Sequence, residues 1–126
     1  MKSANRRGVV FNGTVPRKIR PDDEAKLRVA AIVYGAKQIR VQIHGTSTNS
    51  LEFLVGGQRR TDWDSEQITL DPPPGGVDSH TFVVDIRAAS GQLTKARGEA
   101  ILEASMTGRG DFLRDSLLTL HTSIVP

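Results

Sequence analysis

Apolar and polar residues alternate along most of this chain, in short runs separated by glycine, proline and aspartate. The clearest run spans residues 38–44, where Ile39, Val41 and Ile43 alternate with polar side chains. A period of two is the pattern of a β-strand with one buried face and one solvated face. Several such runs with turn residues between them predict an all-β fold, an antiparallel two-sheet sandwich of about seven or eight strands.

The predicted strands are mostly bounded by turn residues. They lie at residues 9–11, 25–34, 38–44, 51–55, 67–70, 80–87 and 116–125. Asn12-Gly13 predicts a tight turn, residues 35–37 predict a hairpin that pairs the 25–34 and 38–44 strands, and residues 45–50 predict a polar loop. Asp71 to Gly76 holds three prolines and two glycines, which forbid regular structure and indicate a crossover between the sheets.

Residues 93–106 fit two patterns. Leu93, Ala96, Ala100 and Ala104 are spaced like a helix face, whereas Ala100, Leu102, Ala104 and Met106 alternate. Gly98 would cost a helix about 1 kcal/mol relative to alanine. The neighbouring segments are all strands, so a strand from Glu99 to Met106 is the favoured interpretation and a helix the alternative.

The predicted core uses aliphatic residues, because hydrophobic residues make up 37% of the chain but aromatic residues only 5%. Its members are Leu27, Val29, Ile39, Val41, Phe82, Val84, Leu118 and Leu120. A length of 126 residues fits a single domain over residues 1–126, with residues 1–8 as a flexible basic N-terminus.

The composition also predicts a compartment. There is no cysteine, no apolar run long enough to span a membrane, and no apolar h-region of a signal peptide after the basic N-terminal residues. These absences predict a soluble, cytoplasmic protein without disulfides, signal peptide or membrane contact.

Charge is divided unevenly along the sequence. Residues 1–40 carry ten Lys and Arg against three acids, and residues 41–126 carry seven against eleven, which together give the net +3. One interpretation is that basic early strands pack beside acidic later ones. The other is a basic face for an acidic partner.

Six residues are candidate partner contacts. They are Arg17, Lys18, Arg20, Arg59, Arg60 and Trp63. The basic residues suit an acidic protein or, as an alternative, nucleic-acid phosphates, although no aromatic residues are interleaved to stack bases. Trp63 stands alone in an acidic segment. It either anchors that segment to the core or acts as an exposed contact, since tryptophan is a frequent interface hot spot.

Metal-ligating residue types occur without a complete motif. Asp62, Asp64 and Glu66 alternate as calcium ligands can. An EF-hand loop beginning at Asp62 would need Gly at its sixth position and Glu at its twelfth, but these positions hold Gln67 and Pro73. His44, His80 and His121 fall on three different predicted strands, and a zinc site would need them to converge. No metal and no cofactor is predicted.

Catalytic motifs are missing as well. There is no Gly-x-Ser-x-Gly elbow, and the segment 56–60 lacks the Gly-Lys-Ser/Thr of a phosphate loop. The tripeptide 109–111 and the glycosylation sequon 12–14 are short enough to recur by chance. No enzyme activity is predicted.

In strand number, in the proline- and glycine-rich break before the Phe82 strand and in the final paired strands, the chain resembles the immunoglobulin-like β-sandwich modules of bacterial multidomain proteins. The buried tryptophan and paired cysteines of antibody domains are absent. The resemblance implies a non-enzymatic module for protein recognition or structure. The alternatives are a virion or tail subunit that self-assembles and a nucleic-acid binder that uses the basic N-terminal third.

Overall fold

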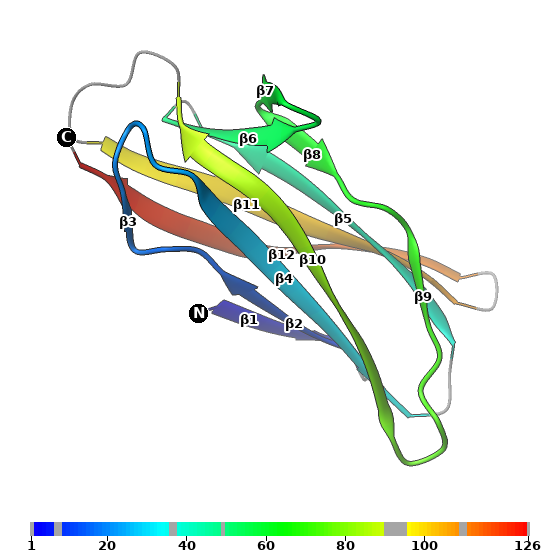
Figure 1. The fold of residues 1–126 in the computed structure, drawn as a ribbon. Coiled ribbons are helices and arrows are strands. Elements are labelled where there is room, and N and C mark those ends of the chain that lie inside the picture. Colours follow the sequence, from blue (N-terminus) through cyan, green and yellow to red (C-terminus); the bar gives the residue numbers. More distant parts are fainter. Residues whose placement is uncertain are drawn as a thin grey trace.

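The computed structural model describes residues 2–6, 9–35, 38–48, 50–89, 96–108 and 111–125. Within this part, side-chain environments are described for residues 9–35, 38–48, 50–89, 97–102 and 119–125. These residues form twelve strands and no helix, in two facing sheets with a hydrophobic cluster between them (Figure 1). The prediction of an all-β two-sheet sandwich is confirmed. No helix of the described residues is long and apolar enough to cross a membrane.

The first sheet consists of β1 (Lys2–Arg6), β2 (Val9–Thr14), β4 (Ala25–Tyr34), β6 (Leu51–Val55), β7 (Gln58–Arg60) and β10 (Val77–Ala88). Its spatial order is β1-β2-β4-β10-β6-β7, and every neighbouring pair is antiparallel. The β6–β7 hairpin turns through Gly56 and Gly57, with φ of 59° and 80°. Positive φ at both central residues is what a tight two-residue hairpin turn needs and what glycine permits.

The second sheet consists of β3 (Lys18–Ile19), β5 (Ile39–Ser47), β8 (Asp62–Asp64), β9 (Ile68–Leu70), β11 (Ala96–Gly108) and β12 (Asp111–Ile124). Its order is β3-β12-β11-β5-β8, and β9 pairs with β5 beyond the end of β8. Only the short β3–β12 pair is parallel among the described strands. The predicted strand from Glu99 to Met106 lies inside β11 and is confirmed, and the 71–76 segment crosses between the sheets as expected.

Eight of the twelve strands have five residues or more, and the other four have two or three. The eight predicted strands correspond to seven of these longer strands and to the short β9, whereas β1 was not predicted. β3, β7 and β8 are too short to show an alternation of their own. Only their pairing with neighbouring strands identifies them.

The alternating residues of the long strands build the core. Among the described side chains, twenty-one apolar ones are buried in one cluster, including Phe11, Leu27, Phe53, Phe82 and Ile86. Of the predicted core, Leu27, Val29, Val41, Phe82, Val84 and Leu120 are buried. Ile39 is half-buried against the cluster, and the side chain of Leu118 lies outside the described residues.

The predicted hairpin between residues 25–34 and 38–44 is wrong. β4 pairs with β2 on one side and with β10 on the other, and β5 belongs to the opposite sheet. Both edges of β4 are therefore occupied. Gly35, with φ of 103°, begins a connection that leads from one sheet to the other.

Two expectations for the N-terminal region also change. Asn12 and Gly13 are not a turn, because they lie inside β2 opposite Ala30 and Val29. Residues 2–6, expected within a flexible segment, form β1 and pair with β2 from Lys2↔Gly13 to Arg6↔Val9. The Asn-Gly turn signal is overridden because β2 is held by ladders on both of its edges.

Candidate functional site

The first sheet turns one face to the core and the other to solvent. In β4 the buried positions are Leu27, Val29, Ala31 and Val33, and the residues between them point outward. The same alternation holds for β2 around Phe11 and for β10 around Phe82 and Val84. The outward residues of these three strands form the outer face of the first sheet, which faces the viewer in Figure 1.

Ten neighbouring positions on this outer face carry no charge, and we call them the uncharged field. They are Val10, Asn12 and Thr14 in β2, Ala30, Ile32 and Tyr34 in β4, and Val77, Ser79, Thr81 and Val83 in β10. The strand registers bring them side by side, as in the rows Val10–Ile32–Ser79 and Asn12–Ala30–Thr81. Val77, Val83 and Tyr34 are 61%, 46% and 46% exposed. In a chain with 25% charged residues, such a field is a distinct surface.

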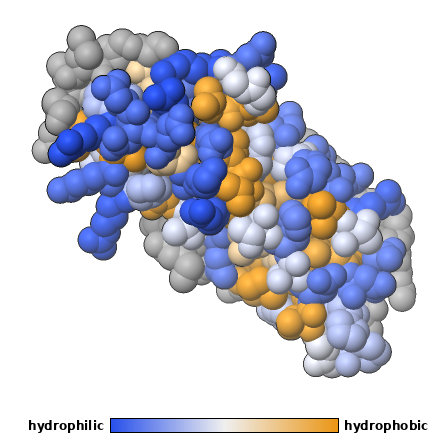
Figure 2. All heavy atoms as spheres, in the orientation of Figure 1, coloured by the Kyte–Doolittle hydropathy of each residue, from blue (hydrophilic) through white to orange (hydrophobic). Residues whose placement is uncertain are grey.

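Cationic residues border the uncharged field at one end. Arg28 lies in register with Thr14 and Val83, and Lys26 follows it toward the start of β4. The Lys26 ammonium contacts Asp85 Oδ1 at 2.7 Å, with both side chains about half exposed. Arg28 has no side-chain partner within the described residues. Figure 2 shows hydrophilic residues gathered at this end and hydrophobic residues interspersed along the strands beyond it.

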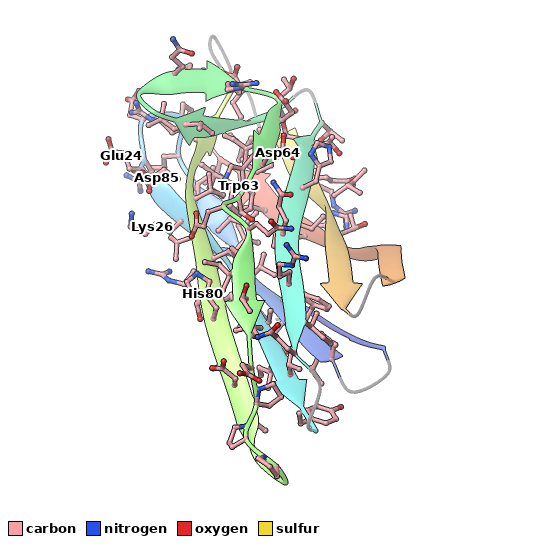
Figure 3. All side chains as sticks on the ribbon, turned by 90° about the vertical axis from the view of Figure 1, so that its right-hand side faces the viewer. Glu24, Lys26, Trp63, Asp64, His80 and Asp85 are labelled. Carbon is pink, nitrogen blue, oxygen red and sulfur yellow. The ribbon has the colours of Figure 1, made fainter. Side chains whose placement is uncertain are left out.

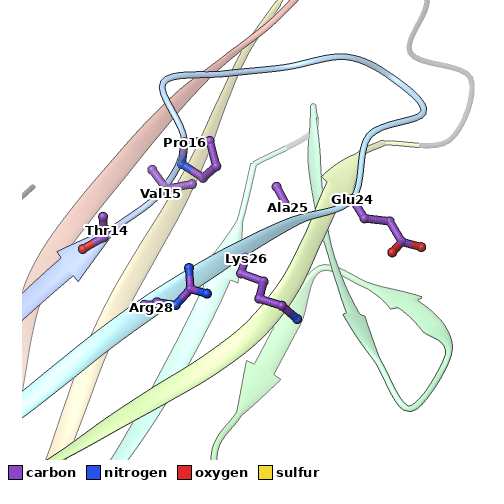
Figure 4. A pocket seen from close by; sticks show the side chains of 7 residues that line it. All are labelled: Thr14, Val15, Pro16, Glu24, Ala25, Lys26 and Arg28. Carbon is purple, nitrogen blue, oxygen red and sulfur yellow. The ribbon is translucent and has the colours of Figure 1, made fainter.

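A shallow hollow adjoins this cationic end. It has a volume of about 370 Å³ and lies between Thr14–Pro16 and the start of β4, with Lys26 and Arg28 on its wall. Figure 4 shows Glu24 on the far side of the hollow, directed away from Arg28. The hollow can therefore receive a small acidic group next to two cations.

Arg17, Lys18 and Arg20 surround the short β3, where the chain passes from β2 to the second sheet and back to β4. All three are exposed, whereas Ile19 between them is buried. The following residues 22–24 are acidic, and Asp23 Oδ2 accepts a hydrogen bond from the Arg20 backbone N–H at 3.0 Å. The segment around β3 thus carries three exposed basic side chains followed by three exposed acidic ones.

Arg59 and Arg60 lie on β7, at the opposite edge of the first sheet from β1. Arg59 contacts Glu52 at 3.3 Å and donates to the Ala88 carbonyl at 2.9 Å, and Arg60 contacts Asp62 at 3.3 Å. Lys26–Asp85, by contrast, is an ion pair between the basic early part and the acidic later part of the sequence. The five predicted basic contacts therefore do not form one unbalanced basic face.

Trp63 is not exposed. It lies in β8 with 7% of its surface accessible, and its ring packs against Phe53 at 6.1 Å between centroids. Figure 3 shows Trp63 directed into the sandwich and Asp64 beside it at the surface. The anchoring interpretation of Trp63 is the one that its burial fits, and 7% of its surface remains accessible.

The three histidines lie apart, each beside a carboxylate. His44 Nδ1 lies 2.6 Å from Asp64, His121 Nδ1 lies 3.2 Å from Glu99, and His80 Nε2 lies 3.6 Å from Glu66. His80 also packs edge-on against Phe82. In the part of the chain that the structure describes, no three His, Asp or Glu side chains are placed to hold a metal ion. The segment 109–111 is only partly described, and the sequon 12–14 ends β2.

The uncharged field and its cationic border were not predicted from the sequence. The signal that was available is the alternation in residues 25–34, which puts Lys26, Arg28, Ile32 and Tyr34 on one face. The contribution of Val77 and Val83 had no such signal, because pairing of β10 with β4 joins segments about fifty residues apart in sequence.

Comparisons with known proteins identify the fold. No protein-family model matches this sequence, and no curated protein is similar to it in sequence. Among solved structures, a cohesin module of a Clostridium perfringens family 33 glycoside hydrolase superposes with a TM-score of 0.54 at 10% identity, covering 91% of this chain and 95% of that one. AvmM, which catalyses macrocyclisation in alchivemycin A biosynthesis, also has a TM-score of 0.54, at 13% identity over 94% and 89% of the two chains. At such identities the likeness shows a shared β-sandwich fold.

Proposed function

We propose that this chain is a non-enzymatic module that works by binding another protein through the outer face of its first sheet. The observation that carries the proposal is the uncharged field, where exposed Val77, Val83 and Tyr34 lie among uncharged neighbours. Exposed apolar surface of this kind, bordered by polar residues, is typical of interaction sites. The fold alone does not decide between a binding module and an enzyme, because it is shared by a cohesin module of a glycoside hydrolase and by AvmM, which catalyses macrocyclisation.

Basic residues near the field supply the preference for an acidic partner. Arg17, Lys18 and Arg20 are exposed and steer an acidic surface toward the field during association. Arg59 and Arg60 contribute to the rim, where their paired carboxylates limit their net charge. The module is a single domain of the immunoglobulin-like kind, and its cysteine-free composition suits the cytoplasm.

Affinity capture from a nuclease-treated lysate of the native host tests this function. We expect the wild-type chain to retain a protein whose capture falls with rising salt and falls further for the double variant Arg17→Glu/Lys18→Glu. Arg40→Glu is the matched control, because Arg40 is an exposed cation of the same basic third but lies on β5, which β12 and β11 separate from β3.

Three results contradict the proposal. Capture that disappears after nuclease treatment indicates a nucleic-acid binder. A large closed assembly in size-exclusion chromatography with light scattering indicates a self-assembling structural subunit. Equal capture by the wild type, the double variant and Arg40→Glu shows that Arg17 and Lys18 do not contribute to binding of the partner.

A further inference from the structure

The face of the uncharged field presents side chains, because the backbone N–H and C=O groups of a strand point along the sheet toward the neighbouring strands. Within the sheet β4 is hydrogen-bonded to β2 and β10, β1 covers the far edge of β2, and β6 covers the far edge of β10 from Asp85 to Ala88. An extended segment laid on this face would leave its own N–H and C=O groups without partners in a newly buried place, which is costly. An α-helix satisfies its backbone internally. The face therefore favours a helical occupant.

The dimensions of the field lead to the same occupant. From Arg28 to Tyr34, β4 advances six residues, which is about 20 Å at about 3.4 Å per residue. Three strands about 4.8 Å apart are about 10 Å wide between the outer two. A helix of about 14 residues is about 21 Å long and about 10 Å wide. With side chains at its margins the field covers roughly 300 Å², well below the roughly 800 Å² per partner of a stable interface between globular proteins.

Charge gives the occupant a direction. The cations Lys26 and Arg28 stand at one end of the field, where Lys26 is paired with Asp85 and Arg28 has no side-chain partner within the described residues. At the other end, Tyr34 and Val77 are opposite each other in the register and are uncharged. A helix C-terminus is the negative end of the helix dipole, so carboxylates and the C-terminal turn suit the cationic end. The hollow beside Arg28 has room for such a carboxylate.

We infer that the uncharged field binds one amphipathic helix of a partner protein, about four turns long. The apolar stripe of this helix packs on Val83, Ile32 and Tyr34, and its acidic last turn lies over Lys26 and Arg28. This inference rests on the proposed protein-binding function and adds to it the class of partner and its orientation.

Selection from a display library of 14-residue helices with randomised surface positions provides the probe. We expect the selected helices to share an apolar stripe and to carry Asp or Glu in the last turn. Their dissociation constants, measured by fluorescence anisotropy, should rise at least tenfold for Val83→Glu. Ile101→Glu is the matched control, since Ile101 is a 38% exposed apolar residue of β11 in the second sheet and its substitution should leave binding unchanged.

Reversal of the border charge tests the orientation. When the Arg28→Glu variant is used as the target of the selection, the enriched helices should carry Lys or Arg in the last turn. Far-UV spectra and urea midpoints check that the variants are folded, and Thr81→Glu replaces Val83→Glu if the latter is not. Helices that bind Val83→Glu as well as wild type, that bind through Ile101, or that show no charge preference overturn the inference, as does a selection that enriches no helix.

The lysate capture described above separates this inference from the function on which it rests. A partner that is retained by Val83→Glu but lost by Arg17→Glu/Lys18→Glu overturns the helix inference and leaves the protein-binding function standing. A wild-type chain that captures no protein contradicts both.

Discussion

Gly45 lies within β5, where three core side chains from other strands surround the position that a Cβ atom would occupy. A Cβ atom at this position would lie 3.1 Å from Leu102 Cδ2, 3.1 Å from Phe53 Cζ and 3.4 Å from Trp63 Cε3. Favourable carbon–carbon contacts are about 3.5–4.0 Å long. A methyl group therefore fits only if at least two side chains of a densely packed core move.

Two opposing effects set the size of the change. Alanine in place of glycine within a strand stabilises the fold by roughly 0.5–1 kcal/mol, because alanine loses less backbone conformational freedom on folding than glycine does. Overpacking a core typically costs about 1–3 kcal/mol. We expect Gly45→Ala to lower the free energy of unfolding by about 1 kcal/mol, and Gly45→Val, which adds two more carbons in the same space, to lower it by about 3 kcal/mol or more.

Urea denaturation followed by far-UV circular dichroism measures both variants, with the fluorescence of the buried Trp63 as a second probe. A double-mutant cycle with Phe53→Leu tests the cause. Removing the ring atom nearest to the new methyl group should make the Gly45→Ala loss smaller by about 0.5–1 kcal/mol. A Gly45→Ala protein at least as stable as the wild type, or a Gly45→Val protein more stable than Gly45→Ala, would refute the reasoning.

Four more substitutions test the register and the buried polar groups by the same denaturation assay. Val41→Ala should cost about 2 kcal/mol because Val41 is fully buried, whereas Arg40→Ala should cost little, and equal losses would place β5 one residue out of register. Ser65→Ala should cost about 1–3 kcal/mol, since Ser65 Oγ accepts the Ile43 N–H at 2.8 Å, and a loss near zero would contradict this role. Thr122→Val should be neutral or stabilising, because the buried Thr122 hydroxyl has no partner within the described residues, and a loss above about 1 kcal/mol would show that it is hydrogen-bonded.

Local alternation predicted the strands well and their pairing poorly. The strand predicted at residues 25–34 is β4 with the same bounds, and the long strand was correctly favoured over a helix around Gly98. The hairpin predicted after Tyr34 is absent because β2 and β10 occupy both edges of β4. Alternation states which residues share a face, but not which strand lies beside them.

Gly45 shows for a single residue that local sequence does not reveal contacts between distant strands. Its sequence neighbours are polar, and they predicted a loop from residue 45 to residue 50. In the fold β5 continues to Ser47, and Gly45 is buried beneath Leu102, Phe53 and Trp63. These three side chains come from β11, β6 and β8, so the need for glycine arises only when both sheets are in place.

The sequence by itself determined the class of fold, the inward and outward residues of each long strand, and the candidate cations of the first third. Only the tertiary structure decided the surface. It buried Trp63, paired Arg59 and Arg60 with carboxylates, and joined outward residues of β2, β4 and β10 into the uncharged field. The physical reason is that a strand's own period fixes which way its side chains point, whereas a binding surface depends on which distant strands share a ladder.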